Sequence, residues 1–284
     1  ALKDFETLPI IVGGVDEASA NACFAFWEKV HKTDLIKVNS SEEAELAKLA
    51  DNLWIDVNIA LANELACLSD RLDCGIDVLS VIAAANTLKK GTGNVNILLP
   101  SAGVGGSCLT KDPVFLETLA RQNSIDFKSS KFSRSVNDGM PAYSASLIAT
   151  HFQAQASKLD KIKILVLGAA FKSNTGDLRM TPVTYFIEAL KREGFLDINL
   201  NDYLAQKSEI EGINCQILED YEGVLKDVDC LCFMAGHDNY KKSLTEYFSK
   251  LKQGALVFDG RMYFPHNQIR VARELGHNFI GIGR

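Results

Sequence analysis

The stretch Ile162-Lys-Ile-Leu-Val-Leu-Gly168 determines how the second half of this 284-residue chain is expected to fold. It is a short apolar run that ends in glycine, a pattern typical of a buried parallel strand followed by a turn. A helix opened by Thr181-Pro182 follows it. Further strands, with helices between them, are predicted near 197–201, 229–234, 255–259 and 279–282. Alternating strands and helices predict a doubly wound parallel sheet.

Three short segments mark where such a sheet would bind a ligand, because ligands lie beyond the carboxyl ends of the strands. They are Gly168, Ala235-Gly-His237 and Asp259-Gly-Arg261. A lone histidine at the end of a strand is more often structural than catalytic, so we expect His237 to have a structural role.

The segment before this sheet is expected to be mostly α-helical. Ser40-Ser-Glu-Glu43 is a capping signature, in which a serine oxygen accepts free helix N–H groups and an acidic side chain reaches back. Residues 44–74 contain neither glycine nor proline and have apolar residues at helical spacing, which predicts one very long helix. Further helices are predicted over 78–87, 113–122 and 141–159.

The beginning of the chain predicts a βαβ unit, with strands over 9–12 and 35–38 and a helix over 17–30. Two strands alone are marginally stable. We therefore expect that the sheet they belong to lies elsewhere in the chain or is missing from it.

Composition excludes several classes of protein. Hydrophobic residues make up 47% of the chain and charged residues 23%, as in ordinary globular proteins. The net charge of −6 argues against a nucleic-acid partner. No apolar run approaches the ~20 residues that cross a bilayer. Residues 1–6 lack the pattern of a signal peptide. We expect a soluble, cytoplasmic protein with no membrane partner.

The seven cysteines indicate neither a disulfide framework nor a metal site, because no C-x-x-C pair occurs. Most of the thiols are expected to be small buried hydrophobes. Cys230 and Cys232 lie in an apolar run and are expected on alternate faces of a strand. Cys108 is the exception.

The strongest functional signal is Pro100-Ser-Ala-Gly-Val-Gly-Gly-Ser-Cys108-Leu-Thr-Lys-Asp-Pro113. Three glycines there leave the backbone able to lie very close to a ligand: Gly103, Gly105 and Gly106. Cys108 follows them, near Lys111 and the N–H groups of a helix that begins at Asp112-Pro113, which favours a thiolate. A structural glycine turn with an incidental buried cysteine is the alternative, and spacing alone does not choose between the two.

This stretch resembles the catalytic cysteine loop of the UDP-glucose/GDP-mannose dehydrogenase family, and other parts of the chain follow that family in order. The other similar stretches are Ile11-Val-Gly-Gly14, Ala44–Asn52, Asn58–Glu64, the loop Gly168-Ala-Ala-Phe-Lys-Ser-Asn-Thr-Gly-Asp-Leu-Arg-Met-Thr-Pro182, Asp259-Gly-Arg261 and Gly281-Ile-Gly-Arg284. Several ordered motifs over nearly the whole chain are far more specific than any one of them.

The resemblance implies oxidation of the C6 hydroxymethyl group of a nucleotide sugar to a carboxylate, with two NAD molecules reduced. Cys108 would form a thiohemiacetal and then a thioester. Lys48 and Asn52, four residues apart on a helix, would stabilise the oxyanion, and Asp112 would order or activate water. Lys48 and Asn52 would otherwise be a solvated helix stripe, and Asp112 a helix cap.

The resemblance also implies further ligand contacts. The substrate-binding residues would be Gly103, Gly105, Gly106, Lys111, Phe171, Lys172 and Arg261, and the cofactor-binding residue would be Arg179. Without the family match, the basic residues would be surface charges, and Phe171 would be a core residue.

Some expected features are missing. No G-x-G-x-x-G fingerprint opens the chain, so residues 1–39 are similar only to the tail of an NAD-binding domain. A fragment or a naturally shortened enzyme, with little or no turnover by itself, is therefore expected. The motifs resemble the UDP-N-acetylhexosamine branch, with UDP-N-acetylmannosamine favoured. Ile55 and Ser107 replace an arginine and a histidine of that branch, and an arginine is missing near 89–93.

We therefore predict an α/β protein with a truncated first Rossmann domain over 1–39. A long central helix with an all-α middle domain follows over 40–159, and a second Rossmann-like parallel-sheet domain that binds the UDP-sugar covers 160–284. The long apolar helix face predicts a homodimer. The predicted activity is that of an NAD-dependent UDP-sugar 6-dehydrogenase. The alternatives are a non-catalytic UDP-binding or oligomerisation module and a UDP-glucose 6-dehydrogenase.

Overall fold

The computed structural model describes residues 7–72, 74–87 and 96–284. The chain forms two compact units, residues 1–54 and 55–284, and each is described by itself. The sequence observations on a signal peptide at 1–6 and on the missing arginine near 89–93 lie outside the described residues. The predicted domain boundaries at 39/40 and 159/160 stay predictions.

The first unit contains the predicted βαβ arrangement. Its elements are β1 (Ile10–Val12), α2 (Glu17–Val30) and β2 (Leu35–Lys37). The two strands are parallel, with Ile10 opposite Leu35. Asp16 caps α2, because its carboxylate accepts the N–H of Ser19 at 2.7 Å.

The predicted long helix is confirmed as α3 (Ser41–Arg71), which begins and ends three residues before the predicted range of 44–74. The Ser40 hydroxyl accepts the N–H of Glu43 at 3.2 Å, which is the predicted capping bond. The Glu43 carboxylate reaches back to the N–H of Asn39 at 2.8 Å, one residue before the cap. Local hydrogen bonds therefore fix where this helix begins.

The other helices before the large sheet are α4 (Val78–Asn86), α5 (Asp112–Gln122) and α6 (Lys128–Ala154). The prediction of a helix over 141–159 is wrong at both ends, because Pro141 lies inside α6. An internal proline costs about 3 kcal/mol. Residues on both sides of it are buried, including Asn137 and Ile148. Burial of this long face outweighs the lost backbone bond.

The second unit contains one six-stranded parallel sheet. Its strands are β3 (Lys163–Leu167), β4 (Asp197–Asn201), β5 (Gln216–Ile217), β6 (Cys230–Phe233), β7 (Leu256–Asp259) and β8 (Asn278–Gly281). Their order is β5-β4-β3-β6-β7-β8, and every neighbouring pair is parallel. This is the order of a doubly wound fold, and it reverses between β3 and β6. The predicted sheet is confirmed. Only the two-residue strand β5, too short to produce a pattern, escaped the prediction.

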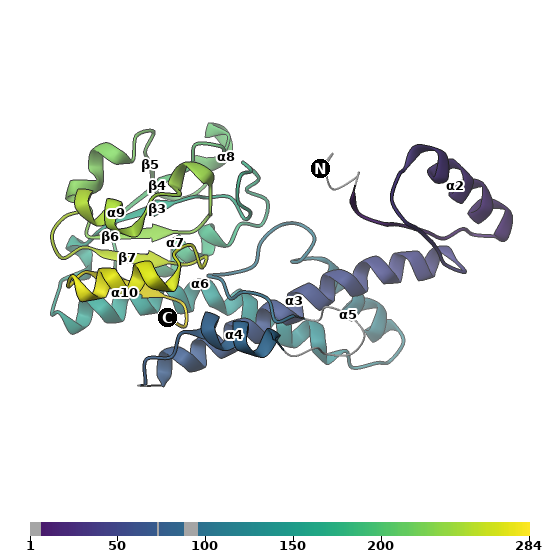
Figure 1. Cartoon of the computed structure of the whole chain (residues 1–284), viewed down its shortest axis with the longest axis horizontal. Coiled ribbons are helices and arrows are strands. Elements are labelled where there is room, and N and C mark those ends of the chain that lie inside the picture. The colour runs from purple at the N-terminus through teal and green to yellow at the C-terminus, as the bar shows by residue number, and fades with distance from the viewer. Residues whose placement is uncertain (1–6, 73, 88–95) are drawn as a thin grey trace. The chain divides into compact units, whose positions relative to one another are not determined.

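Helices cover both faces of this sheet (Figure 1). The helices of this unit that remain are α7 (Pro182–Glu193), α8 (Lys207–Ile210), α9 (Leu244–Lys250), α10 (His266–Glu274) and the 3₁₀ turns η1 (Leu159–Lys161), η2 (Glu222–Asp227) and η3 (Asp238–Tyr240). Helices α6 and α7 share one hydrophobic core with Ile164 and Val166, while α9 and α10 pack with Leu165 and Leu167 on the other face. Burial on both faces explains the continuous apolar run of β3.

Two expectations about cysteines are wrong. Cys230 and Cys232 lie on the same face of β6, with their Sγ atoms 3.6 Å apart, because residues two apart in a strand share a face. Among the described residues, Cys230 and Cys232 are the buried cysteines, whereas Cys67 and Cys215 are half-buried and Cys23, Cys74 and Cys108 are exposed. The prediction that most of the thiols are buried is therefore wrong.

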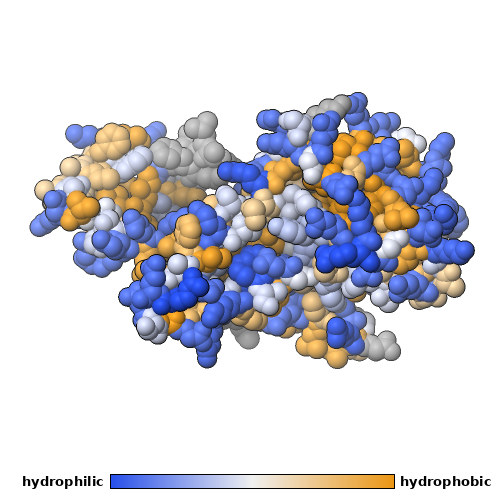
Figure 2. Space-filling view, turned by 180° about the vertical axis from the view of Figure 1, so that it is seen from behind, coloured by the Kyte–Doolittle hydropathy of each residue, from blue (hydrophilic) through white to orange (hydrophobic). Residues whose placement is uncertain are grey.

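The surface shown in Figure 2 is mostly hydrophilic, with apolar patches between the polar groups. Among the described residues, we find no helix whose length and apolar character would allow it to span a bilayer.

We predict that the stability of the fold depends on Gly168, at the point where the chain leaves β3. Its φ is +89°, and a Cβ atom there would lie 2.4 Å from the Cβ of Ala235. Gly254, with φ +79° and no atom within 4 Å of such a Cβ, is the matched control. Gly254→Ala should cost about 1–2 kcal/mol for the left-handed backbone. Gly168→Ala should cost about 1–3 kcal/mol more because of crowding.

Urea unfolding of both variants measures this difference. Equal losses of unfolding free energy would contradict the crowding at Gly168.

Candidate active site around Cys108

A cavity of about 340 Å³ opens beside Cys108 in the second unit. Eight of the residues predicted from the sequence line it: Gly103, Gly105, Gly106, Cys108, Phe171, Lys172, Arg179 and Arg261. They come from the cysteine loop, from the segment after β3 and from the turn after β7. The fold therefore brings together three stretches that are far apart in the sequence.

The glycines of the cysteine loop are needed because the segment after β3 lies directly against them. A Cβ atom on Gly105 would be 2.7 Å from both the Met180 carbonyl oxygen and the Phe171 Cβ. Gly106 has φ +88°, and its N–H donates to the Arg179 carbonyl at 3.2 Å. The glycines thus shape the wall of the cavity, and their contact with a ligand stays a prediction.

Cys108 lies in a turn just before α5, and its side chain is exposed. Its carbonyl oxygen accepts the N–H groups of Lys111 at 3.2 Å and Asp112 at 2.9 Å. The alternative of an incidental buried cysteine is therefore wrong, since the thiol is accessible from the cavity that it lines.

Asp112 and Lys111 both lie at the beginning of α5. Asp112 is 2% exposed and stands in the first turn, where the helix dipole favours a carboxylate. It is not the helix cap that the sequence allowed, because Lys111 occupies the N-cap position. The Lys111 ammonium lies 3.7 Å from Asp112 and 4.8 Å from the centre of the Phe115 ring. Its predicted substrate contact rests on the sequence alone.

Arg261 bridges the three stretches of the site. Its Nε donates to the Met234 carbonyl at 2.7 Å, and its Nη atoms donate to the carbonyls of Gly103 at 3.3 Å and Phe171 at 3.4 Å. Burial lowers the pKa of Arg261 to about 10, so the side chain is still protonated at neutral pH. This cation both holds the walls together and contributes positive charge to the cavity.

The turn after β7 explains how Arg261 is placed. The buried Asp259 carboxylate accepts the N–H groups of Arg261, Tyr263 and Phe264 at 2.9–3.1 Å. The carbonyl of Gly260 accepts the N–H of Ala102 at 2.9 Å. Aspartate therefore fixes the turn, and glycine allows the cysteine loop to approach it.

Arg179 and Lys172 add two exposed cations. The Arg179 guanidinium, 71% exposed, forms a fork with Asp177 whose shortest bond is 2.6 Å. That bond raises the pKa of Arg179. The cavity combines a thiol with three cationic side chains, which suits a ligand that carries phosphate groups and a carbon to be attacked.

A buried polar network, which sequence reasoning missed, holds the beginning of the cysteine loop. The Asn63 side chain accepts the N–H of Ser101 at 2.8 Å and donates to Asn137 at 2.9 Å. Asn137 in turn donates to the Asp56 carboxylate at 2.8 Å. Asp56, Asn63 and Asn137 are at most 1% exposed. Two polar residues seven apart on the predicted long helix, Asp56 and Asn63, were the available sequence signal.

The same network holds the end of the loop through Arg134. Its Nη1 donates to Asp56 at 2.7 Å and to the carbonyl of Leu109 at 3.3 Å. Its Nη2 pairs with Asp138. The residue directly after Cys108 is thereby tied to α6 and to the buried part of α3.

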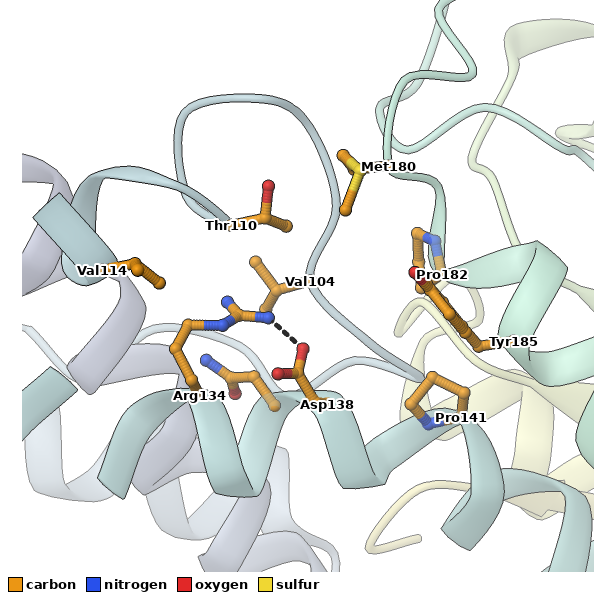
Figure 3. Close-up of a pocket in the computed structure, with 10 residues that line it drawn as sticks. Val104, Thr110, Val114, Arg134, Asp138, Pro141, Met180, Pro182 and Tyr185 are labelled. Carbon is orange, nitrogen blue, oxygen red and sulfur yellow. Dashed lines mark hydrogen bonds and ion pairs between the residues drawn. The ribbon is translucent and has the colours of Figure 1, made fainter. Parts of the chain in front are cut away.

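Behind the cysteine loop lies a second cavity of about 390 Å³ (Figure 3). Arg134 and Asp138 form its polar side, and Met180, Pro182 and Tyr185 form a more apolar side. Val104 lines both cavities. The loop therefore separates two hollows, and only the first contains the thiol.

Lys48 and Asn52 lie on α3 within the first unit, where Lys48 is exposed and Asn52 is half-buried. Cys108 belongs to the second unit. Their predicted role at the oxyanion therefore stays a prediction.

Comparison with known proteins connects these features with a family. Residues 42–139 match the central domain of the UDP-glucose/GDP-mannose dehydrogenase family, and residues 165–266 match its UDP-binding domain. A UDP-N-acetyl-D-mannosamine dehydrogenase from Pyrococcus horikoshii is 31% identical over 274 residues, which cover 96% of this chain and 59% of that protein.

Two solved structures are similar in fold. An NDP-N-acetyl-D-galactosaminuronic acid dehydrogenase from Methanosarcina mazei gives a TM-score of 0.83 at 28% identity, covering 100% of this chain and 59% of that one. A UDP-glucose dehydrogenase from Pyrobaculum islandicum gives 0.81 at 27% identity, covering 100% and 60%. The chain thus spans about 60% of the length of these relatives.

Asn63→Asp should destabilise the protein strongly. The substitution removes a donor to Asn137 and puts a second carboxylate into the buried network of Asp56, which should cost about 3–5 kcal/mol at neutral pH. Burial would raise the folded-state pKa of the new carboxyl group above its unfolded value of about 3.9. Folding then favours the protonated form, so the loss should shrink as the pH falls from about 8 to about 5.

Urea unfolding at several pH values measures this effect. Asn58→Asp is the control, because Asn58 is only half-buried, although it accepts the N–H of Leu98 at 2.6 Å. It should lose about 1 kcal/mol. A pH-independent loss at position 63, or one equal to the control, would contradict the assignment.

Proposed function

The chain belongs to the UDP-glucose/GDP-mannose dehydrogenase family, and on this premise we propose that it acts in the NAD-dependent oxidation of a UDP-sugar. The reaction converts a C6 hydroxymethyl group into a carboxylate in two steps, a four-electron oxidation. A UDP-N-acetylhexosamine is the proposed substrate, with UDP-N-acetylmannosamine favoured. The names of relatives that include a UDP-N-acetyl-D-mannosamine dehydrogenase support this choice.

The observation that carries the proposal is the shared cavity of Cys108, Lys172, Arg179 and Arg261. Lys172 and Arg261 match the two phosphates of a UDP-sugar, and the exposed Cys108 lies in the same cavity. The basic residues all fall within the part of the chain that matches a UDP-binding domain. We propose that Gly103, Gly105, Gly106 and Phe171 shape the sugar side of the cavity.

The residues of the chain divide the chemistry as follows. The Cys108 thiolate adds to the C6 carbon of the aldehyde that the first oxidation yields, forming a thiohemiacetal. After the second oxidation the sulfur holds C6 as a thioester. Water attacks this carbon, the C–S bond breaks, and the thiolate is regenerated with the carboxylate product. Asp112, one turn after Cys108, would order the water, and Lys48 with Asn52 would stabilise the oxyanion.

NAD, when bound, supplies the hydride acceptor for each oxidation. Arg179 fits a role in holding it, because its guanidinium is exposed on the wall of the cavity that contains Cys108. A cation in this place suits a phosphate of a dinucleotide.

A cytoplasmic homodimer is the proposed form of the protein. Support for the dimer comes from the apolar side chains exposed on α3 and α5, namely Leu61, Leu68, Val114, Phe115 and Leu119. Such side chains would be covered by a second copy.

Cys108 should react with iodoacetamide faster than the other two exposed thiols, Cys23 and Cys74. We propose that Cys108, which lines a cavity together with cationic side chains, is the activated nucleophile. UDP-N-acetylmannosamine should slow labelling of Cys108 alone, because it would occupy the same cavity. Peptide mass spectrometry follows each site, with Cys108→Ser as the control for assignment. Equal, slow labelling at the three sites would exclude an activated nucleophile and favour a non-catalytic UDP-binding module.

Thermal shifts with uridine nucleotides test the ligand. A ligand at about 100 times its Kd adds about 2.7 kcal/mol, which should raise Tm by several degrees in a chain of this size. We expect UDP-N-acetylmannosamine to give a larger shift than UDP-glucose, and Lys172→Gln to reduce both. A larger shift with UDP-glucose would favour the alternative substrate. No shift with any uridine nucleotide would contradict the proposed site.

A further inference from the structure

We propose that His237 is a positioning residue, which keeps Phe171 and Lys172 on the cavity wall by accepting a backbone hydrogen bond at Nδ1. The inference rests on the proposed function, because the segment that it holds lines the proposed UDP-sugar cavity. It assigns a task to a side chain for which the sequence indicated only a structural role.

The hydrogen bonds of His237 fix which ring nitrogen carries the proton. The ring is fully buried after β6. Its Nε2 lies 3.0 Å from the Asp202 carboxylate, and its Nδ1 lies 2.9 Å from the backbone nitrogen of Asn174. An ionised carboxylate only accepts, and a backbone N–H only donates. The proton is therefore on Nε2, and Nδ1 is the acceptor for Asn174.

Asp202 must be ionised for this arrangement. Burial acts to raise the pKa of Asp202, but hydrogen bonds, with that from His237 first among them, outweigh it and keep the pKa below the ordinary value. The same carboxylate accepts four backbone N–H groups at 2.7–3.1 Å: those of Ala169, Ala170, Leu204 and Ala205. Asp202 thus anchors the start of the segment after β3 and also orients His237.

Phe171 and Lys172 lie between two fixed points. The bonds from Ala169 and Ala170 to Asp202 hold one end, and the bond from Asn174 to His237 holds the other. Because His237 also forms a hydrogen bond with Asp202, both points belong to one buried hydrogen-bond network. Bonds at both ends therefore hold the short backbone between them, which carries Phe171 and Lys172, at the cavity wall.

The second fixed point is the backbone of Asn174. Its φ is +57°, a left-handed conformation that asparagine adopts more readily than most other non-glycine residues. The N–H of Asp238 donates to the Asn174 side chain at 2.9 Å, so the two segments bond each other in both directions. A Cβ atom on Gly236 would lie 2.9 Å from the Ser173 hydroxyl, which shows how closely they approach.

His237 does not take part in proton transfer under this proposal. Both ring nitrogens are engaged within the protein, and the ring has no exposed surface. The expected signature of its loss is therefore weaker ligand binding and a loosened segment. We expect about a 10- to 100-fold rise in the Kd for UDP when the bond to Asn174 is lost.

His237→Met and His237→Gln separate the hydrogen bonds from the bulk of the side chain. Methionine removes the acceptor and the donor, whereas the glutamine amide can present one of each. His266→Met is the control, because the Nδ1 of His266, on α10, lies 2.7 Å from Asp77, the N-cap of α4, in a separate histidine–aspartate pair.

The experiment measures UDP binding by calorimetry and amide hydrogen exchange over residues 170–174 in the full 284-residue chain. His237→Met should weaken UDP binding at least about tenfold and speed exchange in that segment. His237→Gln should restore most of both, and His266→Met should change neither. Unchanged affinity and exchange in His237→Met would overturn the proposal, as would equal effects of the glutamine and methionine variants.

Two further readouts keep the test decisive. If the unsubstituted chain does not bind UDP, the proposed function fails, while hydrogen exchange still decides the role of His237. If His237→Met does not fold, nitrogen NMR of the unsubstituted chain identifies the tautomer at neutral pH. A proton on Nε2 would support the proposal, and a proton on Nδ1 would overturn it.

Discussion

The cysteine loop depends on a buried polar network that holds it at both ends. Asn63 fixes the loop at Ser101, and Arg134 fixes it at Leu109, next to the thiol. Both connect through the Asp56 carboxylate and Asn137. A glycine-rich backbone has little conformational preference of its own. The network therefore supplies the rigidity that the loop sequence lacks and keeps Cys108 at one place in the cavity.

The parallel sheet contributes the other wall of the site. The segments that form this wall follow the carboxyl ends of strands on either side of the point where the strand order reverses. The segment after β3 carries Phe171, Lys172 and Arg179, and the turn after β7 carries Arg261. The Arg261 guanidinium joins these parts by donating to backbone carbonyls, and among the described residues it forms no ion pair with a carboxylate. One helical and one sheet layer thus meet at a hollow with a thiol and fixed cations, which is the chemistry that the family match leads one to expect.

Much of the fold could be predicted because its signals are local. The apolar run before Gly168 indicates a buried strand. The hydrogen bond from the N–H of Glu43 to Ser40 caps α3 at the place that the sequence indicated. Pro141 was misread as a helix start, since its tolerance inside α6 depends on burial against distant residues. The error at Cys230 and Cys232 was different, because strand periodicity alone places residues two apart on one face.

By itself, the sequence determined the family, the parallel sheet, the long helix and the identity of eight residues that line the cavity. Local periodicity and ordered motifs carry this information. Only the tertiary structure decided what holds those residues. The bonded partners are far apart in the chain: Ser101 comes 38 residues after Asn63, and His237 comes 63 residues after Asn174. No local pattern records such pairings, because each forms only when folding removes both groups from water.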